Sequence, residues 1–188
     1  MHSNKLKVLA IAVALASPLA ANAESNVTIN TGTINATARV NFSILIPRFI
    51  FLQVGTGTPF AANATIDTID FAPAITVVGN NTPVAGTGGN LTGGSVTVRI
   101  VGNAGNVTLA ATGPANLTSG TDTIPWTQIA TATTGGATHP VVNGANATFT
   151  AASNVVNING TWVYSYLNNA TPAGGTYTGQ VLYTATTP

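Results

Sequence analysis

The sequence lacks cysteine and carries very few charges. None of its 188 residues is a cysteine, which excludes disulfides, thiolate metal sites and thiol chemistry. Only 5 Lys and Arg and 4 Asp and Glu side chains carry a formal charge, and the net charge is +1. The fold must therefore be held together by backbone hydrogen bonds and by the packing of apolar side chains.

The first 23 residues have the three parts of a secretory signal peptide. Lys5 and Lys7 form a basic start, VLAIAVALASPLA is a short apolar stretch, and Ala21-Asn22-Ala23 is a small-residue cleavage motif. The apolar stretch is too short to span a membrane, and no later stretch is apolar enough to do so. We therefore predict that residues 1–23 are a bacterial signal peptide. The protein would be exported to the periplasm, the cell surface or the extracellular space.

Beyond residue 23 the chain has no lysine and is close to neutral. The remaining charged residues are Arg39, Arg48, Arg99, Glu24, Asp67, Asp70 and Asp122. Three arginines cannot follow a phosphate backbone, so a nucleic-acid partner is excluded. No basic patch is available for an anionic membrane surface either. A nearly uncharged surface favours association, which leaves open a neutral monomeric domain or a subunit that binds its own copies.

Apolar and polar residues alternate along most of the mature chain, and no stretch keeps a helical period. This pattern predicts short strands separated by turns rich in Gly, Asn and Pro. We expect a single all-β domain over residues 39–188, an immunoglobulin-like antiparallel β-sandwich, preceded by an N-terminal extension at 24–38. GNAG at 102–105 indicates a hairpin, and the Gly-rich stretch 79–94 indicates a surface loop. The expected strands are 26–31, 34–46, 48–54, 64–71, 75–78, 95–101, 106–112, 124–132, 146–150, 160–167 and 176–186.

Residues that usually carry catalysis are scarce. His139, the one histidine of the mature chain, precedes Pro140 and is interpreted as a solvated loop residue. No serine lies in a G-x-S-x-G motif. The sequence therefore predicts a protein that is not an enzyme and that has no cofactor and no metal site. A calcium site using Asp67, Asp70 and Asp122 is the weaker alternative, because no calcium-loop motif accompanies them.

The aromatic residues leave two interpretations open. In GTWVYSYL, Trp162, Tyr164 and Tyr166 share one face of the expected strand. A central strand whose Trp and Tyr side chains pack in the core is favoured. A sugar-stacking platform that uses Trp126 or Trp162 is the alternative.

The two ends of the mature chain have the most distinctive patterns. Near the N-terminus, apolar residues alternate with polar ones from Ile34 to Ile46, and Pro47 ends the run. Such a long strand usually spans a whole sheet or is shared with a partner. Near the C-terminus, PAGGTYTGQVLYTAT alternates again, with a gap at Gly179 that another side chain or another backbone could fill.

These ends resemble those of chaperone–usher pilus subunits of the archaic, spore-coat-U-like class. The features are the signal peptide, the alternating N-terminal segment, the Thr- and Gly-rich β domain and the C-terminal PAGGTYTGQVLYTAT. Gly175 is fourteenth from the last residue, where many such pilins have glycine. The sequence departs from the family at Thr187, where many pilins have an aromatic residue, and in lacking the usual disulfide.

The resemblance implies an incomplete β-sandwich whose groove accepts a strand from the next subunit. It implies a homopolymer, a fimbria or pilus with a role in cell adhesion, or a surface layer. A periplasmic chaperone and an outer-membrane usher would be further partners. The expected donor residues are Val27, Ile29, Ile34, Ala36 and Ala38, and the expected acceptor-groove residues are Gly175, Tyr177, Gly179, Val181 and Tyr183. The alternative function is a monomeric exported binding module for a glycan or a surface partner.

Overall fold

The computed structural model of the chain describes residues 25–188. The predicted signal peptide, residues 1–23, lies outside these described residues. The chain divides into two compact units, Met1–Ile46 and Pro47–Pro188. The boundary falls at Pro47, which ends the N-terminal alternating run, whereas the sequence indicated that the β domain starts at residue 39.

The described part of the first unit, residues 25–46, contains no strand and no helix, and every one of its residues is exposed. The strands expected at 26–31 and 34–46 are therefore wrong for this chain taken alone. Their apolar alternation is compatible with a strand, but a strand forms only where another strand satisfies its backbone. Within the segment, the Thr28 hydroxyl donates a hydrogen bond to the Asn35 carbonyl oxygen at 3.0 Å.

The second unit is built of antiparallel strands, and its described helical structure is a single 3-10 turn, η1 (Trp126–Gln128). The all-β, antiparallel part of the fold prediction is confirmed. The strands are β1 (Ile50–Val54), β2 (Ile69–Asp70), β3 (Val84–Ala85), β4 (Thr87–Gly88), β5 (Ser95–Gly102), β6 (Val107–Thr112), β7 (Asn116–Ser119), β8 (Asp122–Pro125), β9 (Ile129–Thr133), β10 (Ala147–Phe149), β11 (Val156–Tyr166) and β12 (Leu182–Thr186).

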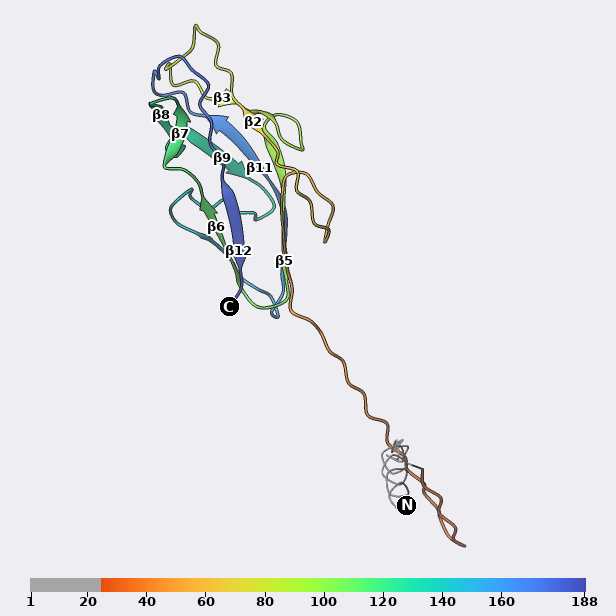
Figure 1. Cartoon of the computed structure of the whole chain (residues 1–188). Helices are drawn as coiled ribbons and strands as arrows, with labels where there is room; N and C mark the ends of the chain where they lie inside the picture. The colour runs from red at the N-terminus through yellow and green to blue at the C-terminus, as the bar shows by residue number, and fades with distance from the viewer. Residues whose placement is uncertain (1–24) are drawn as a thin grey trace, which may run out of the picture. The chain divides into compact units, whose positions relative to one another are not determined.

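Two sheets contain most of these strands (Figure 1). The larger sheet has the order β1-β5-β11-β3, and β9 pairs with β11 on its other edge. The smaller sheet has the order β10-β6-β12. Two short pairs, β2 with β4 and β7 with β8, stand apart from them. The 11-residue β11 is central because it pairs with β5 from Val156 to Val163 on one side and with β9 from Trp162 to Tyr166 on the other.

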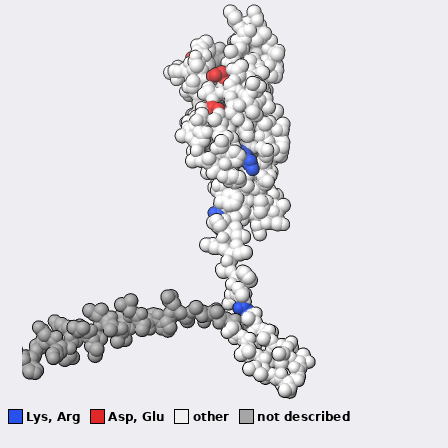
Figure 2. Space-filling model, turned by 90° about the vertical axis from the view of Figure 1, so that its right-hand side faces the viewer, with Lys and Arg blue, Asp and Glu red and all other residues white. Residues whose placement is uncertain are grey.

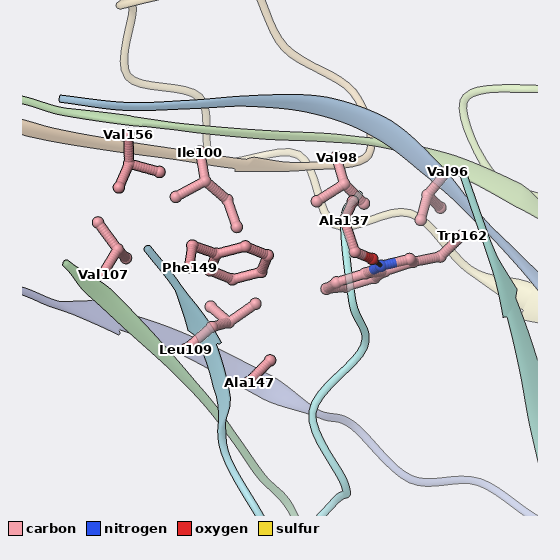
Figure 3. Packing of buried hydrophobic residues seen from close by; sticks show 10 residues of the cluster. All are labelled: Val96, Val98, Ile100, Val107, Leu109, Ala137, Ala147, Phe149, Val156 and Trp162. Carbon is pink, nitrogen blue, oxygen red and sulfur yellow. Dashed lines mark hydrogen bonds between the residues drawn. The ribbon is translucent and has the colours of Figure 1, made fainter. Parts of the chain in front are cut away.

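The core is a single cluster of buried side chains that both sheets supply (Figure 3). Val98 and Ile100 of β5 and Trp162 of β11 come from the larger sheet, and Leu109 of β6 and Phe149 of β10 from the smaller one. In β5 and β6 alternate residues point inward, as the period-2 pattern predicted. The Trp162 indole nitrogen, fully buried, donates a hydrogen bond to the Ala137 carbonyl oxygen at 2.5 Å.

The hairpin predicted at GNAG is wrong. The strands on either side of it, β5 and β6, belong to different sheets, so Gly102–Gly105 crosses from one sheet to the other. The crossing lets Ile100 and Leu109 face each other across the core, whereas a hairpin would have placed both strands in one sheet. Gly105 makes the turn possible with a φ of +94°, which a residue with a Cβ rarely adopts.

Other differences from the expected strands are local. Residues 75–78 form turns, the stretch 79–94 contains β3 and β4, and β7 with β8 forms a hairpin at 116–125. The strand expected at 124–132 is interrupted by η1, and the one expected at 176–186 is regular only over β12, with an isolated bridge between Thr178 and Thr118. The stretches 79–94 and 116–125 are rich in Gly, Thr and Asn, whose local side-chain and backbone contacts influence the conformation.

Candidate functional site

The candidate site is the free edge of β12. This strand pairs with β6 from Leu182↔Thr112 to Thr186↔Thr108, and within residues 25–188 no strand pairs with its other edge. The side chains alternate as predicted: Tyr183 and Ala185 pack against the core, and Leu182 and Thr184 are exposed. An edge strand of this kind presents unpaired backbone groups to any strand that approaches it.

The register shows which backbone groups face outward. On the far side of β6, the Ala111 carbonyl oxygen accepts a hydrogen bond from the Asn143 N–H at 2.9 Å. Ala111 therefore directs its backbone groups away from β12, and its partner Tyr183 directs its own away from β6. By alternation Ala185 does the same, so the N–H and C=O groups of Tyr183 and Ala185 line the free edge.

A second edge strand lies beside β12. β1 is the outermost strand of the larger sheet and approaches β12, but among the described residues no backbone pair joins them. A hydrogen bond connects the residues that flank the two strands: Arg48 Nη2, before β1, donates to the Pro188 carbonyl oxygen, after β12, at 2.6 Å. The two sheets therefore meet on this side through neighbouring edges without closing into one hydrogen-bonded surface.

The predicted acceptor residues differ in their burial and in their contacts. Val181 and Tyr183 are half-buried and line a cavity of about 40 Å³ together with Trp126, Ile129, Thr131, His139, Val142 and Tyr164. Tyr177 is held locally, because its hydroxyl donates to the Ala173 carbonyl oxygen at 2.9 Å. Gly175 lies beside Ser119, since a Cβ at this glycine would stand 2.4 Å from the Ser119 hydroxyl oxygen.

The gap expected at Gly179 is filled by the chain itself. A Cβ at this position would stand 2.9 Å from the Trp126 ring and 3.1 Å from a methyl group of Leu117. Trp126 is fixed there by a hydrogen bond from its indole nitrogen to the Pro114 carbonyl oxygen at 2.8 Å. Gly179 thus lets an aromatic ring of the same unit approach the backbone.

His139 is not a solvated loop residue, as the sequence had suggested, but lies half-buried among aromatic rings. Its Nε2 lies 2.8 Å from the Tyr183 hydroxyl, which in turn lies 3.2 Å from the Tyr164 hydroxyl. The Trp162 ring is 4.5 Å away, edge-on. Burial lowers the pKa of His139 to about 4 and raises the pKa of both tyrosines. No residue spacing in the sequence indicated this cluster.

The predicted donor residues are all exposed. Val27, Ile29 and Ile34 leave most of their side-chain surface uncovered, and Ala36 and Ala38 are exposed too. The exposed apolar row continues beyond them through Val40, Phe42, Ile44 and Ile46. These four positions fall in the range 39–188 predicted for the β domain, but their alternation continues that of Ile34–Ala38 without a break.

The structure decides between the two interpretations of the Trp162 strand. Trp162 is fully buried and Tyr166 is buried, which confirms the core packing and excludes Trp162 from a sugar platform.

Asp67 accepts hydrogen bonds from the Thr56 N–H at 2.5 Å and hydroxyl at 2.8 Å. Within the described residues no three acidic or histidine side chains gather in a geometry that could hold a metal ion.

No family model and no curated protein matches this sequence. Among the described residues, no helix has the length and apolar character needed to cross a membrane.

Proposed function

We propose that the second unit is an immunoglobulin-like β-sandwich that lacks one strand. In an immunoglobulin constant-type sandwich the sheets have the orders A-B-E-D and C-F-G. The order β1-β5-β11-β9 resembles A-B-E-D. In the smaller sheet, β10-β6-β12, the pair β6-β12 corresponds to C-F, and β10 is an additional strand beside β6. The position of strand G lies at the outer edge of β12, where the Tyr183 and Ala185 backbone groups point. The observation that carries the proposal is this open position beside β12.

The strand that completes the sandwich is the exposed N-terminal segment of a second copy. Strand addition at a sheet edge uses backbone hydrogen bonds for affinity and alternate side chains for specificity. The segment offers a row of apolar side chains at every second residue, and Phe42 is 90% exposed in the single chain. Burying each large apolar side chain contributes about 1.5–3 kcal/mol, so a few of them suffice to drive association.

Such a contact is heterologous, because the donor and acceptor surfaces differ. Each subunit that accepts a strand still offers its own segment, so the assembly extends as a fibre unless the rotation closes it into a ring. We therefore propose an exported structural subunit of a fimbria, pilus or surface layer. During export a periplasmic chaperone would cover the open edge, and an outer-membrane usher would receive the subunit.

Neighbouring residues on opposite faces of the segment provide a matched test. Phe42→Asp places a charge in the apolar row, and Asn41→Asp places the same charge one residue away on the other face. Both positions are exposed in the single chain, so neither substitution should change the stability of the subunit. We expect purified wild type and Asn41→Asp to form ladders on non-boiled gels and fibres in electron micrographs, and Phe42→Asp to remain monomeric.

The predicted N-terminal part of the donor is tested in the same way by Ile29→Asp against Asn30→Asp. If Phe42→Asp and Ile29→Asp both assemble like wild type, the proposed donor segment is wrong. If wild type itself stays monomeric at high concentration with its signal peptide removed, the assembly proposal fails as a whole.

A further inference from the structure

A second surface lies on the outer face of the larger sheet, away from the core. Phe51 and Gln53 of β1 stand directly opposite Val101 and Arg99 of β5, so these four side chains share one face. Asn159 of β11 pairs with Arg99 from the other side and extends the row. This face is separate from the β12 edge, so the inference goes beyond the proposed assembly and does not depend on it.

The loop between β1 and β2 places a third aromatic ring on this surface. Phe60 lies 5.1 Å from Phe51 and 6.1 Å from Phe49, measured between ring centroids. The loop is closed by Asp67, which accepts two hydrogen bonds from Thr56. Phe60 has a φ of +61°, a conformation that is energetically unfavourable for a bulky residue.

These rings are not hidden after the loop folds back. Phe60 remains 59% exposed and Phe49 42% exposed. A cluster that served only to complete a core would cover its rings, as the Trp162 cluster does. The loop therefore holds an aromatic ring at the surface although the backbone conformation at Phe60 is unfavourable.

Arg99 gives this surface an unpaired positive charge. Its guanidinium carbon lies 5.5 Å from the Phe60 ring centroid, and its Nε is buried without a hydrogen-bond partner. No carboxylate within residues 25–188 forms an ion pair with it. On the face drawn in Figure 2, few atoms belong to Lys, Arg, Asp or Glu. A half-buried cation without a partner is costly, and an anion placed beside it would recover that cost.

We propose that this surface binds a saccharide that carries a carboxylate. A pyranose ring has apolar C–H faces that stack on aromatic rings, here the exposed Phe60 ring, with the Phe49 ring edge-on beside it. The carboxylate would accept charge-assisted hydrogen bonds from Arg99. Two side chains are available for the sugar's hydroxyl groups. The Asn159 side chain is exposed and forms no hydrogen bond among the described residues. The Gln53 side-chain nitrogen already donates to the Gly55 and Gly57 carbonyl oxygens, which leaves the Gln53 side-chain oxygen as an acceptor.

Calorimetric titration of the purified protein with 3′-sialyllactose and with lactose tests the proposal, because the two differ by the carboxylate-bearing residue. A glucuronate-containing disaccharide distinguishes a uronic from a sialic acid, and sodium acetate measures simple ion pairing. We expect binding of one or both acidic sugars, no binding of lactose, and no saturable binding of acetate. Arg99→Gln should weaken binding about ten- to hundredfold.

Phe60→Ala should also weaken binding at least tenfold, whereas Val141→Ala, which removes an equally exposed apolar side chain elsewhere, should not change it. Because Phe60 is exposed, its loss should leave the fold intact even if Arg99→Gln does not fold. Absence of binding to both acidic sugars, or binding that both variants leave unchanged, overturns the proposal. Binding of a poly-glutamate peptide instead of the sugars would assign the surface to acidic peptides and equally overturn it.

Discussion

β5 and the segment 25–46 share an alternation of apolar and polar residues, but the apolar side chains are buried in β5 and exposed in the segment. In β5, Val96, Val98 and Ile100 alternate with polar residues and are buried, and Val98 has no exposed surface. In the segment, Val40, Phe42 and Ile44 alternate in the same way and are largely exposed. The difference is that β5 has a strand on each side, whereas the segment has none. Alternation thus specifies the faces of a strand, but pairing decides whether the strand exists.

The largest expected effect comes from truncating an aromatic residue in each region. Trp162→Ala should lower the free energy of unfolding by about 3–5 kcal/mol, because it removes a fully buried ring and its hydrogen bond to Ala137. Phe42→Ala should change it by less than about 0.5 kcal/mol in the monomer. Urea unfolding followed by circular dichroism measures both. A large loss for Phe42→Ala in a monomeric sample would show that the segment packs on its own chain.

The regularity of the alternation decided which strands could be predicted from the sequence. β5 and β6 were predicted to within one residue at each end, because their buried faces alternate regularly with polar residues. β11 begins at Val156, four residues before the strand that was predicted at 160–167. The sheet to which each strand belongs was not predictable: GNAG has hairpin chemistry, but Gly102–Gly105 joins different sheets. That choice depends on which faces meet in the core, and this is a property of the whole chain.

The candidate site was predictable in part. The alternation of Tyr183 and Ala185 placed the last strand's inner face correctly. The proposed donor residues lie in an alternating polar–apolar row that is visible in the sequence. The filling of the Gly179 gap by Trp126 was not predictable, because the 3-10 turn that carries Trp126 lies more than fifty residues earlier in the chain. His139 was missed for the same reason, since its tyrosine partners come from β11 and β12.

A pair of proline substitutions tests the direction of the β12 backbone groups. The Thr184 N–H faces β6, so Thr184→Pro should cost about 2–3 kcal/mol through a lost ladder hydrogen bond. The Ala185 N–H faces the free edge, so Ala185→Pro should cost less, and it should still prevent assembly. Unfolding curves and non-boiled gels measure the two effects. Normal ladders from a folded Ala185→Pro protein would mean that this edge accepts no strand.

Acid should weaken the compact unit and leave the segment unaffected. The folded-state pKa of His139 is about 4, below the ordinary 6.5, because burial disfavours its charged form. As the pH falls from about 6.5 to about 4, the unfolded chain binds a proton that the folded chain does not, so stability is lost on acidification. We expect a loss of roughly 2 kcal/mol, allowing for the partial exposure of the ring.

Urea midpoints at pH 7 and pH 4.5, for wild type and His139→Gln, measure this dependence. The groups that face His139 are the Tyr183 and Tyr164 hydroxyls, which stay neutral throughout this range. The variant should therefore lose most of the pH dependence between these values. Residues 25–46 contain no group that titrates there, so amide exchange in the segment, corrected for its intrinsic pH dependence, should be unchanged. An equally steep dependence in His139→Gln would assign the acid sensitivity to another group.

The smallest effect separates two glycines near the C-terminal strand. Gly179→Ala should destabilise the unit by about 1 kcal/mol, because the new Cβ would meet the Trp126 ring and Leu117, which must shift. Gly174→Ala should be neutral or slightly stabilising, because no atom lies within 4 Å of its added Cβ. Unfolding curves report both effects, and the tryptophan emission maximum, to which the buried Trp162 contributes equally in both variants, reports a shift of Trp126. If the two variants behave alike, Trp126 does not occupy the space beside Gly179, and that space is open to a side chain of a donor strand instead.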